Sequence, residues 1–446
     1  MNSADETPKV MIDGFNLGLS RGTGVATYAR NLSFACHQSG YSTGILYGSP
    51  VRRRTRSDLM TEVSFFDVEQ PLNTSQEFLR DLARLIPHPG GYRPFRVPIS
   101  GEVVTRALAS RLPHFDSLWN VPDLYPSADY QFALTGRFHK VMNVSKTQIM
   151  HWTYPLPLKM RGARNVYTLH DLVPLRLPYA TLDRKSSYLK LVNRCVREAD
   201  VIATVSETSR SDIIRILNCD PDKVVNTYQA VSLPVALVQM DDAEVQAKVE
   251  GIFGLKHKGY FLFFGAIEPK KNVGRLTEAF LTSNVSSQLA IVGPTGWQSD
   301  QELRFFNDMA QRQLKKTGPF PTADQKLFRF EFVPLALLIA LIKGARATIF
   351  PSLIEGFGLP ILESMLLGTP VITSKGGATE EIAGDAALLV DPYNTLEIAS
   401  AIQKIDGDGE LRQKLGALGQ QRATLFSPER YHERLQALYQ PLLAGL

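Results

Sequence analysis

The sequence predicts an α/β protein with two doubly wound, parallel-sheet domains that face each other across a cleft. Three observations support this prediction. The chain has 446 residues, too many for one typical domain. Short apolar runs alternate with helical patterns in both halves, as in parallel sheets covered by helices. A polar stretch at 241–258 separates the two halves and is expected to be the interdomain linker.

The N-terminal half, residues 1–240, begins as a strand, a glycine-rich loop, a helix and a second strand, which is the parallel α/β unit. Residues 50–145 mix proline, glycine, aromatic and basic residues, and their pattern assigns no order of elements. Expected strands lie at 10–12, 43–47, 165–169 and 201–205, and expected helices at 28–37, 184–198 and from 206 onward.

The second domain is expected at residues 259–428, where strands and helices alternate regularly. Ligands of such sheets bind outside the carboxyl ends of the strands, which places the site in the cleft between the domains. Expected strands lie at 260–264, 289–292, 328–332, 347–350 and 370–373, and expected helices at 273–281, 335–343, 360–367 and from 396 to the end.

Composition excludes several classes of protein. The three cysteines, Cys36, Cys195 and Cys219, share no close spacing, which predicts a reducing, cytoplasmic location without disulfides or a zinc site. The apolar run 332–342 is far shorter than the ~20 residues that span a bilayer. No nucleic-acid-binding motif is present, so nucleic acid is not an expected partner. The net charge is +5, with +7 in residues 1–240 and −2 in residues 241–446. It fits either peripheral contact with an anionic membrane or a random excess of arginine.

The most informative segment runs from the apolar strand 347–350 through a glycine-bearing turn to a helix that opens at Pro360. A strand, a glycine turn and a helix start together present bare N–H groups and a positive dipole end to an anion. Glu355 and Glu363 bracket this turn, and their carboxylates suit hydroxyl groups. A site that binds an anion next to carboxylates that bind hydroxyl groups is the kind of site expected for a nucleotide sugar.

In their order along the chain, these motifs resemble the retaining glycosyltransferases of family 4, which have the GT-B fold of two facing Rossmann-like domains. The pair Glu-x7-Glu is weak alone, but it is specific within an ordered set of blocks. The blocks lie at 264–272, 351–363, 369–372, 381–387 and 390–392, and more sparsely at 22–25, 170–171 and 205–207. The fold also implies that the last helix, 429–446, crosses back to the N-terminal domain.

The resemblance implies that Glu363 accepts hydrogen bonds from the ribose hydroxyls of the donor, and that Glu355 lies against the transferred sugar. The alternatives are a helix-start acid for Glu363 and a solvated loop acid for Glu355. The other residues expected to line the donor pocket, mainly through their backbone, are Gly265, Gly356, Phe357, Gly358 and Leu359.

Lys270 and Lys271 are expected to neutralise the donor diphosphate and stabilise the leaving group electrostatically. The alternative is a solvated turn. The family commonly has an arginine here, and this chain has lysines and Ala266 instead, which supply charge without a bidentate fork. With the lysines and the helix dipole in this role, the resemblance implies transfer without a metal or other cofactor.

Two N-terminal segments complete the expected site. Gly22, Thr23 and Gly24 follow the first strand, and the resemblance places their amides near the diphosphate or the acceptor. His170 ends a strand and is expected to approach the transferred sugar. An ordinary loop and a structural histidine are the alternatives. Glu381 is expected to be a helix-start acid.

Residues 151–157 and 168–178 resemble bacterial mannosyltransferases of exopolysaccharide and O-antigen assembly. This implies GDP-mannose as donor and a lipid-linked oligosaccharide as acceptor, at the inner face of the cytoplasmic membrane. Since no nucleophilic carboxylate stands out, the implied mechanism is front-face transfer with retention. The alternatives are a UDP- or dTDP-sugar donor, a sugar-nucleotide epimerase of the same fold, and a non-catalytic nucleotide-sugar-binding protein.

Overall fold

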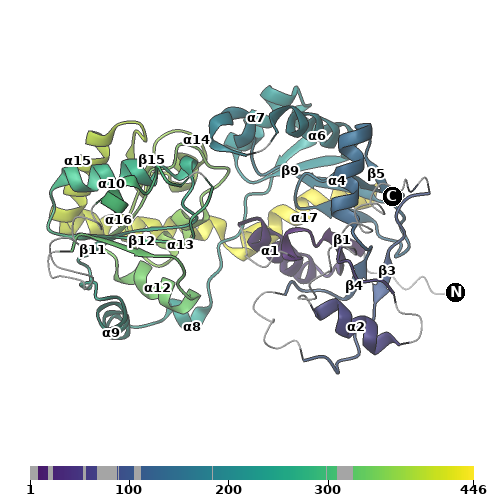
Figure 1. Ribbon diagram of the computed structural model, residues 1–446, viewed down its shortest axis with the longest axis horizontal. Coiled ribbons are helices and arrows are strands. Elements are labelled where there is room, and N and C mark those ends of the chain that lie inside the picture. The colour runs from purple at the N-terminus through teal and green to yellow at the C-terminus, as the bar shows by residue number, and fades with distance from the viewer. Residues whose placement is uncertain are drawn as a thin grey trace.

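The computed structural model shows two α/β lobes side by side, joined by the C-terminal helix α17, which runs from one lobe into the other (Figure 1). The residues that the structure describes are 9–18, 24–53, 57–67, 88, 90–104, 112–182, 184–297, 299–308 and 325–445. Each lobe is built on its own sheet, and helices cover both sheets, as the alternating pattern predicts.

The N-terminal sheet has the strand order β10-β9-β8-β6-β1-β2-β4-β3 and is parallel except for the antiparallel edge strand β3. Its strands are β1 Lys9–Asp13, β2 Ser42–Tyr47, β3 Phe95–Val97, β4 Ser117–Asn120, β6 Ile149–Trp152, β8 Arg164–Thr168, β9 Val201–Thr204 and β10 Val224–Asn226. A separate pair is formed by β5 His139–Val141 and β7 Leu158–Met160. The helices are α1 Gly24–Gln38, α2 Asp58–Phe66, α4 Leu124–Thr135, α5 Val173–Arg176, α6 Lys185–Glu198 and α7 Glu207–Leu217.

The C-terminal sheet is parallel throughout and has the order β13-β12-β11-β14-β15-β16. Counted from its first strand this is 3-2-1-4-5-6, the order of dinucleotide-binding domains. Its strands are β11 Tyr260–Phe264, β12 Gln288–Val292, β13 Leu327–Phe330, β14 Ala347–Phe350, β15 Val371–Ser374 and β16 Leu388–Val390. The helices are α10 Val273–Ser283, α12 Leu335–Gly344, α13 Leu359–Leu366, α14 Gly377–Ala383, α15 Thr395–Gly407 and α16 Gly409–Ala423.

The stretch 241–258, expected to be a linker, is instead largely helical. It contains α9, Asp242–Phe253, which packs on α12 of the C-terminal domain together with the short helix α8, Val235–Val238. Asp241 caps α9 by accepting a hydrogen bond from the Glu244 amide at 2.7 Å. The chain therefore passes between the domains earlier, over residues 227–234.

Residues 50–145, for which the sequence assigns no order, include the described elements α2, β3, β4, α4 and β5. Their strands are three or four residues long, too short for an alternating pattern to emerge. Helix α13 begins at Leu359, one residue before the predicted Pro360, and Gly358 occupies its N-cap position.

The last helix, α17 Pro428–Ala444, packs against α1 and β6 and completes the N-terminal core (Figure 1). The hydroxyl of Tyr439 lies 2.6 Å from Nδ1 of the buried His151, and Thr168 Oγ1 lies 2.7 Å from Nε2 of the same ring. Burial lowers the pKa of His151 to about 3, so the imidazole is neutral. This histidine joins α17 to the sheet and is not part of the cleft.

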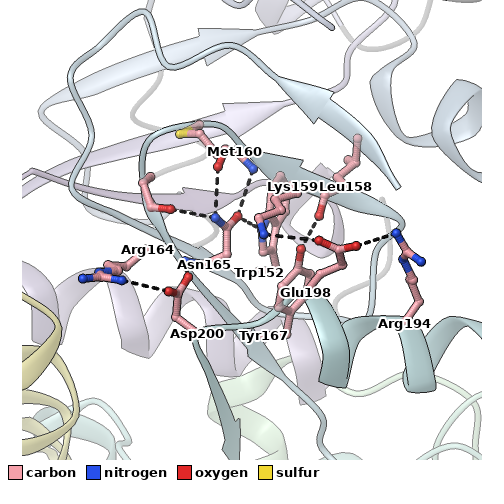
Figure 2. Close-up of polar contacts among 11 residues, drawn as sticks. Trp152, Leu158, Lys159, Met160, Arg164, Asn165, Tyr167, Arg194, Glu198 and Asp200 are labelled. Carbon is pink, nitrogen blue, oxygen red and sulfur yellow. Dashed lines mark hydrogen bonds and ion pairs between the residues drawn. The ribbon is translucent and has the colours of Figure 1, made fainter. Parts of the chain in front are cut away.

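A buried asparagine ties β6, β7 and β8 together (Figure 2). Asn165 Oδ1 accepts hydrogen bonds from Trp152 Nε1 at 3.1 Å and from the Met160 amide at 2.9 Å. Its Nδ2 donates to the carbonyls of Met160 and Ala163. A buried carboxamide costs free energy unless such partners are present. The network therefore fixes the relative positions of β6 and β8, whose carboxyl ends lead into the cleft.

Candidate active site

The two donor segments follow the two central strands of the C-terminal sheet. Residues 265–272 follow β11 and residues 351–358 follow β14, so they flank the point where the strand order reverses. Asn272 joins them, because its Nδ2 donates to the carbonyls of Pro351 at 2.9 Å and Pro392 at 2.7 Å. The Leu353 amide also donates to the Lys270 carbonyl at 2.8 Å. Sequence reasoning assigned no role to Asn272.

Gly265 ends β11 with a φ of +139°, a conformation that favours glycine. The loop after β12 approaches it directly, since a Cβ on Gly293 would lie 2.0 Å from the Gly265 carbonyl oxygen. The two glycines thus allow backbone to pack on backbone at this edge of the sheet.

Lys271 and Glu355 form an ion pair with 2.5 Å between Nζ and Oε1, and both side chains are mostly buried. Burial would raise the pKa of Glu355, but Lys271 and Lys270 outweigh burial and lower it. Neither residue is the solvated loop residue of the alternative interpretation. The ion pair places one ammonium group and one carboxylate on the C-terminal domain's side of the cleft.

Lys270 lies beside the pair, and its Nζ is 3.7 Å from Oε2 of Glu268. Burial would lower the pKa of Lys270, but Glu355, Asp171 and Glu268 raise it overall. The ammonium group is therefore charged. The three carboxylates of Glu355, Asp171 and Glu268 surround the two lysines. In the ligand-free structure this part of the cleft therefore has no excess of positive charge.

Glu363 lies in α13, and none of the described residues donates a hydrogen bond to its carboxylate. Burial raises its pKa to about 7. An isolated, partly buried carboxylate is stabilised by hydroxyl donors, which a ribose supplies as a pair. The geometry thus fits the role that the family resemblance implies.

Gly356 is the point where the two domains touch. A Cβ at this position would lie 2.8 Å from Asp171 Oδ2 and 2.9 Å from the His170 carbonyl oxygen. Ser206 Oγ, at the N-cap of α7, donates to the Gly356 carbonyl at 2.8 Å. The sequence predicted glycine here for close approach of a ligand, whereas the structure shows that the other domain requires it.

The next two residues of the loop have different structural roles. Phe357 is buried, and its ring packs on Tyr228 and Phe426, where the chain crosses between the domains. Gly358 has a φ of +122° and precedes α13, whose first residue is Leu359. Only the backbone of Phe357 is therefore placed to contribute to a ligand site.

His170 follows β8 and contributes a neutral imidazole at the cleft. Its Nε2 donates to the Thr153 carbonyl at 2.9 Å, which leaves Nδ1 as the acceptor. Burial lowers the pKa of His170. The Tyr28 ring packs edge-on against the imidazole with centroids 4.8 Å apart and limits its orientation.

The predicted glycine loop of the N-terminal domain is only partly described. Gly22 and Thr23 lie outside the described residues, and Gly24 is the first residue of α1.

Glu381 joins the domains at a second point, near α7 and α14 (Figure 1). Its carboxylate accepts hydrogen bonds from the amides of Glu207 at 2.7 Å and Thr208 at 2.9 Å, the first two residues of α7. The expected role at the start of its own helix is wrong, because Glu381 lies late in α14 and its carboxylate instead binds the first amides of α7 in the other domain. Nothing in the local sequence could reveal this, because Glu381 and Glu207 are distant along the chain.

A cavity of about 420 Å³ lies between the domains. Asp171, Val173 and Thr181 line it from the N-terminal domain, and Glu268, Lys270 and Trp297 line it from the C-terminal domain. Carboxylates, an ammonium group and an aromatic face are the groups that bind sugars. Trp297 also packs against an apolar cluster that contains Val173. The sequence reasoning missed Trp297.

Comparison with known proteins agrees with this geometry. Residues 247–422 match the family described as "Glycosyl transferases group 1", and residues 22–233 match "Glycosyltransferase Family 4". The chain is 32% identical over 277 residues to the O-antigen chain mannosyltransferase B of Escherichia coli, which covers 61% of this chain and 69% of that protein. The chain is a family 4 glycosyltransferase.

Two further comparisons extend this assignment. The glycosyltransferase is 28% identical to the O-antigen chain mannosyltransferase RfbU of Salmonella typhimurium, over 57% of this chain and 63% of that protein. Its structure resembles the sucrose-phosphate synthase of Thermosynechococcus elongatus with a TM-score of 0.65 and 16% identity, over 99% of this chain and 100% of that chain. Together with the two facing sheets, this confirms the predicted GT-B fold.

Substituting Gly356→Ala should lower the rate of sugar transfer about 5- to 150-fold, because overpacking of ~1–3 kcal/mol separates the donor loop from Asp171 and His170. Steady-state kinetics with thermal melting measure this effect. Gly251→Ala is the matched control, since a Cβ there meets nothing within 4 Å. An unchanged rate for Gly356→Ala would contradict the closed contact.

Substituting Glu363→Gln should weaken donor binding at least about tenfold, because hydrogen bonds to an ionised group contribute ~1.5–3 kcal/mol.

The same change should stabilise the fold at pH 8 by up to about 3 kcal/mol. The raised pKa of about 7 means that ionisation of Glu363 costs stability as pH rises. The gain should vanish below pH 4.5, its ordinary pKa. Titration calorimetry and melting at both pH values test this, with Glu278→Gln on the exposed face of α10 as control. Equal donor affinity would disprove the ribose role.

Proposed function

We propose that this glycosyltransferase moves mannose from GDP-mannose, with retention of configuration, onto a lipid-linked oligosaccharide during surface polysaccharide assembly. The main support is the similarity to O-antigen chain mannosyltransferases. The second support is that Lys270, Lys271, Glu355 and Glu363 all lie beyond the carboxyl ends of the central strands β11 and β14. The polar, partly aromatic cavity beside them suits a sugar acceptor.

In the proposed donor complex, the diphosphate lies against Lys270 and Lys271. Because Lys271 already pairs with Glu355, the diphosphate shares or replaces that partner. Glu355 is then free to accept a hydrogen bond from a hydroxyl of the transferred sugar. Glu363 holds the ribose. The amides of 356–359 and the start of α13 add positive potential near the phosphates.

The proposed reaction is front-face transfer. The bond from the sugar C1 to the phosphate oxygen breaks while the acceptor oxygen bonds to C1 on the same face. The acceptor proton passes to the departing phosphate oxygen. The carboxylates lining the cavity support this proposal: Asp171 accepts the Val173 amide, and Glu268 lies near Lys270. Glu355 is paired to Lys271, so each of these three carboxylates has a protein partner in the ligand-free structure. The lysines then stabilise the leaving group without a metal ion.

A donor panel tests the sugar specificity. The purified chain should show a melting shift and slow hydrolysis with GDP-mannose, and much smaller effects with GDP-glucose, UDP-sugars and dTDP-sugars. The anomeric configuration of the product, measured by NMR, should match that of the donor. Lys271→Ala should reduce transfer by ~10²–10³. A preference for UDP-sugars would overturn the mannosyl proposal and leave the family assignment intact.

We also propose peripheral contact with the inner face of the cytoplasmic membrane through α2. Three of its apolar side chains are exposed, namely Leu59, Met60 and Val63, and Arg52 and Arg53 precede the helix. Apolar side chains beside cations suit the interface of an anionic bilayer. The helix ends near the cleft, because Phe65 packs on Tyr47 at the carboxyl end of β2. Within the described ranges, no helix is long and apolar enough to cross a membrane.

Flotation with vesicles tests this contact. The chain should float with phosphatidylglycerol vesicles at low salt and much less at 0.5 M salt, where charges are screened. Met60→Glu should reduce flotation severalfold. Leu396→Glu, at an exposed apolar position of the other domain, should not. Equal flotation of the two variants would contradict a role for α2.

A further inference from the structure

A group of potential metal ligands lies in the N-terminal domain, away from the cleft. His37 is in the last turn of α1, and His114 and Asp116 precede β4. The three residues each offer one ligand atom, and these atoms lie within 4.8 Å of one another. The two imidazole rings are stacked with centroids 3.7 Å apart. Because the residues come from distant parts of the sequence, their spacing gave no sign of a site.

Two of the three residues are held in place by hydrogen bonds to neighbouring elements. Asp116 Oδ2 accepts the Thr43 amide at 2.7 Å, and the His114 amide donates to Ser33 Oγ at 2.9 Å. The other carboxylate oxygen of Asp116 lies 3.7 Å from His114 Nε2, too far for a hydrogen bond. Strand β2 and helix α1 thus position Asp116 and His114 before any ligand binds.

One nitrogen of this group lacks a partner. His114 Nε2 is buried and has no hydrogen bond to any described residue. A buried polar atom without a partner costs ~1–3 kcal/mol, so binding a ligand at this nitrogen would be favourable. The stacked His37 ring provides no hydrogen bond to it. A cation at the edges of the two rings, beside the Asp116 carboxylate, would satisfy this nitrogen.

We propose that His37, His114 and Asp116 bind a divalent transition-metal ion of the Zn²⁺ class, with water completing the coordination. Two imidazoles and one carboxylate suit Zn²⁺, Co²⁺ or Ni²⁺, whereas Mg²⁺ and Ca²⁺ prefer oxygen ligands. Metal–ligand distances near 2 Å require the ligand atoms to move closer together. His37 is exposed at a helix end and is free to turn towards the other two residues.

The position of the site determines its role. α1 ends and β4 begins at the opposite end of the sheet from Asp13, the last residue of β1, and from His170, which follows β8. A metal ion here contacts neither donor nor acceptor. It links the end of α1 to the chain entering β4, and therefore stabilises the N-terminal domain. The proposal is independent of the proposed mannosyl transfer.

The test uses the full chain freed of metal by chelation and then titrated with ZnCl₂. Binding of one Zn²⁺ per chain should raise the melting temperature by several degrees, because a ligand of the folded state stabilises it. MgCl₂ at the same concentration should not. Cobalt loading should give visible absorption bands of a nitrogen- and oxygen-ligated ion.

Variants locate the site. His114→Ala and Asp116→Asn should lose the zinc-dependent shift, and the exposed His37→Ala serves if either fails to fold. His257→Ala is the matched control, because His257 Nε2 lies 3.3 Å from Asp242 in a pair with no second histidine. It should keep the shift. A parental chain without stoichiometric zinc, or a full shift in the His37 and His114 variants, would overturn the proposal. Sugar transfer by the zinc-free chain is a separate readout.

Discussion

The geometry of the cleft depends on backbone contact between the domains at Gly356. No side chain fits between this residue and the end of β8, and the Ser206 hydroxyl holds its carbonyl from the same side. The loop is thereby oriented on both flanks: Glu355 reaches Lys271, and Phe357 enters the aromatic cluster at the domain crossing. The loop that carries the proposed donor site is therefore positioned by residues of the other domain.

A second constraint is electrostatic. Two buried lysines would repel each other without a ligand, and the three carboxylates of Glu268, Glu355 and Asp171 compensate them. These carboxylates raise the pKa of Lys270 despite its burial, so its ammonium group is charged. In the proposed donor complex, the diphosphate competes with these carboxylates for the same ammonium groups, so part of the binding free energy is used to rearrange the pairs. Glu363 differs from these carboxylates, because it is partly buried without a partner among the described residues, and the proposed ribose contact would supply one.

The two crossings between domains lie side by side and are stabilised together. The Val231 amide donates to the Phe426 carbonyl at 2.9 Å, and the rings of Tyr228 and Phe426 pack edge-on. Arg434 of α17 lies over the Tyr228 ring, 4.8 Å from its centroid. Phe357 of the loop 351–358 is part of this cluster. A rotation of one domain against the other would therefore displace this loop. The hydrogen bonds between the Glu381 carboxylate and the first amides of α7 join the two domains at a separate point.

The sequence by itself determined the α/β class, most C-terminal elements and the donor segments, because apolar periodicity, the glycine turn and Glu355–Glu363 are local features. It failed at residues 50–145, whose strands are short, and at 241–258, where buried Val245 and Val249 make a helix. Only the tertiary structure decided how the site residues are paired. The contacts of Gly356 with Asp171, of Glu381 with α7 and of Lys271 with Glu355 join distant residues. The physical reason is that hydrogen bonds and charge pairs act over a few ångströms in space, whereas a sequence records only neighbours along the chain.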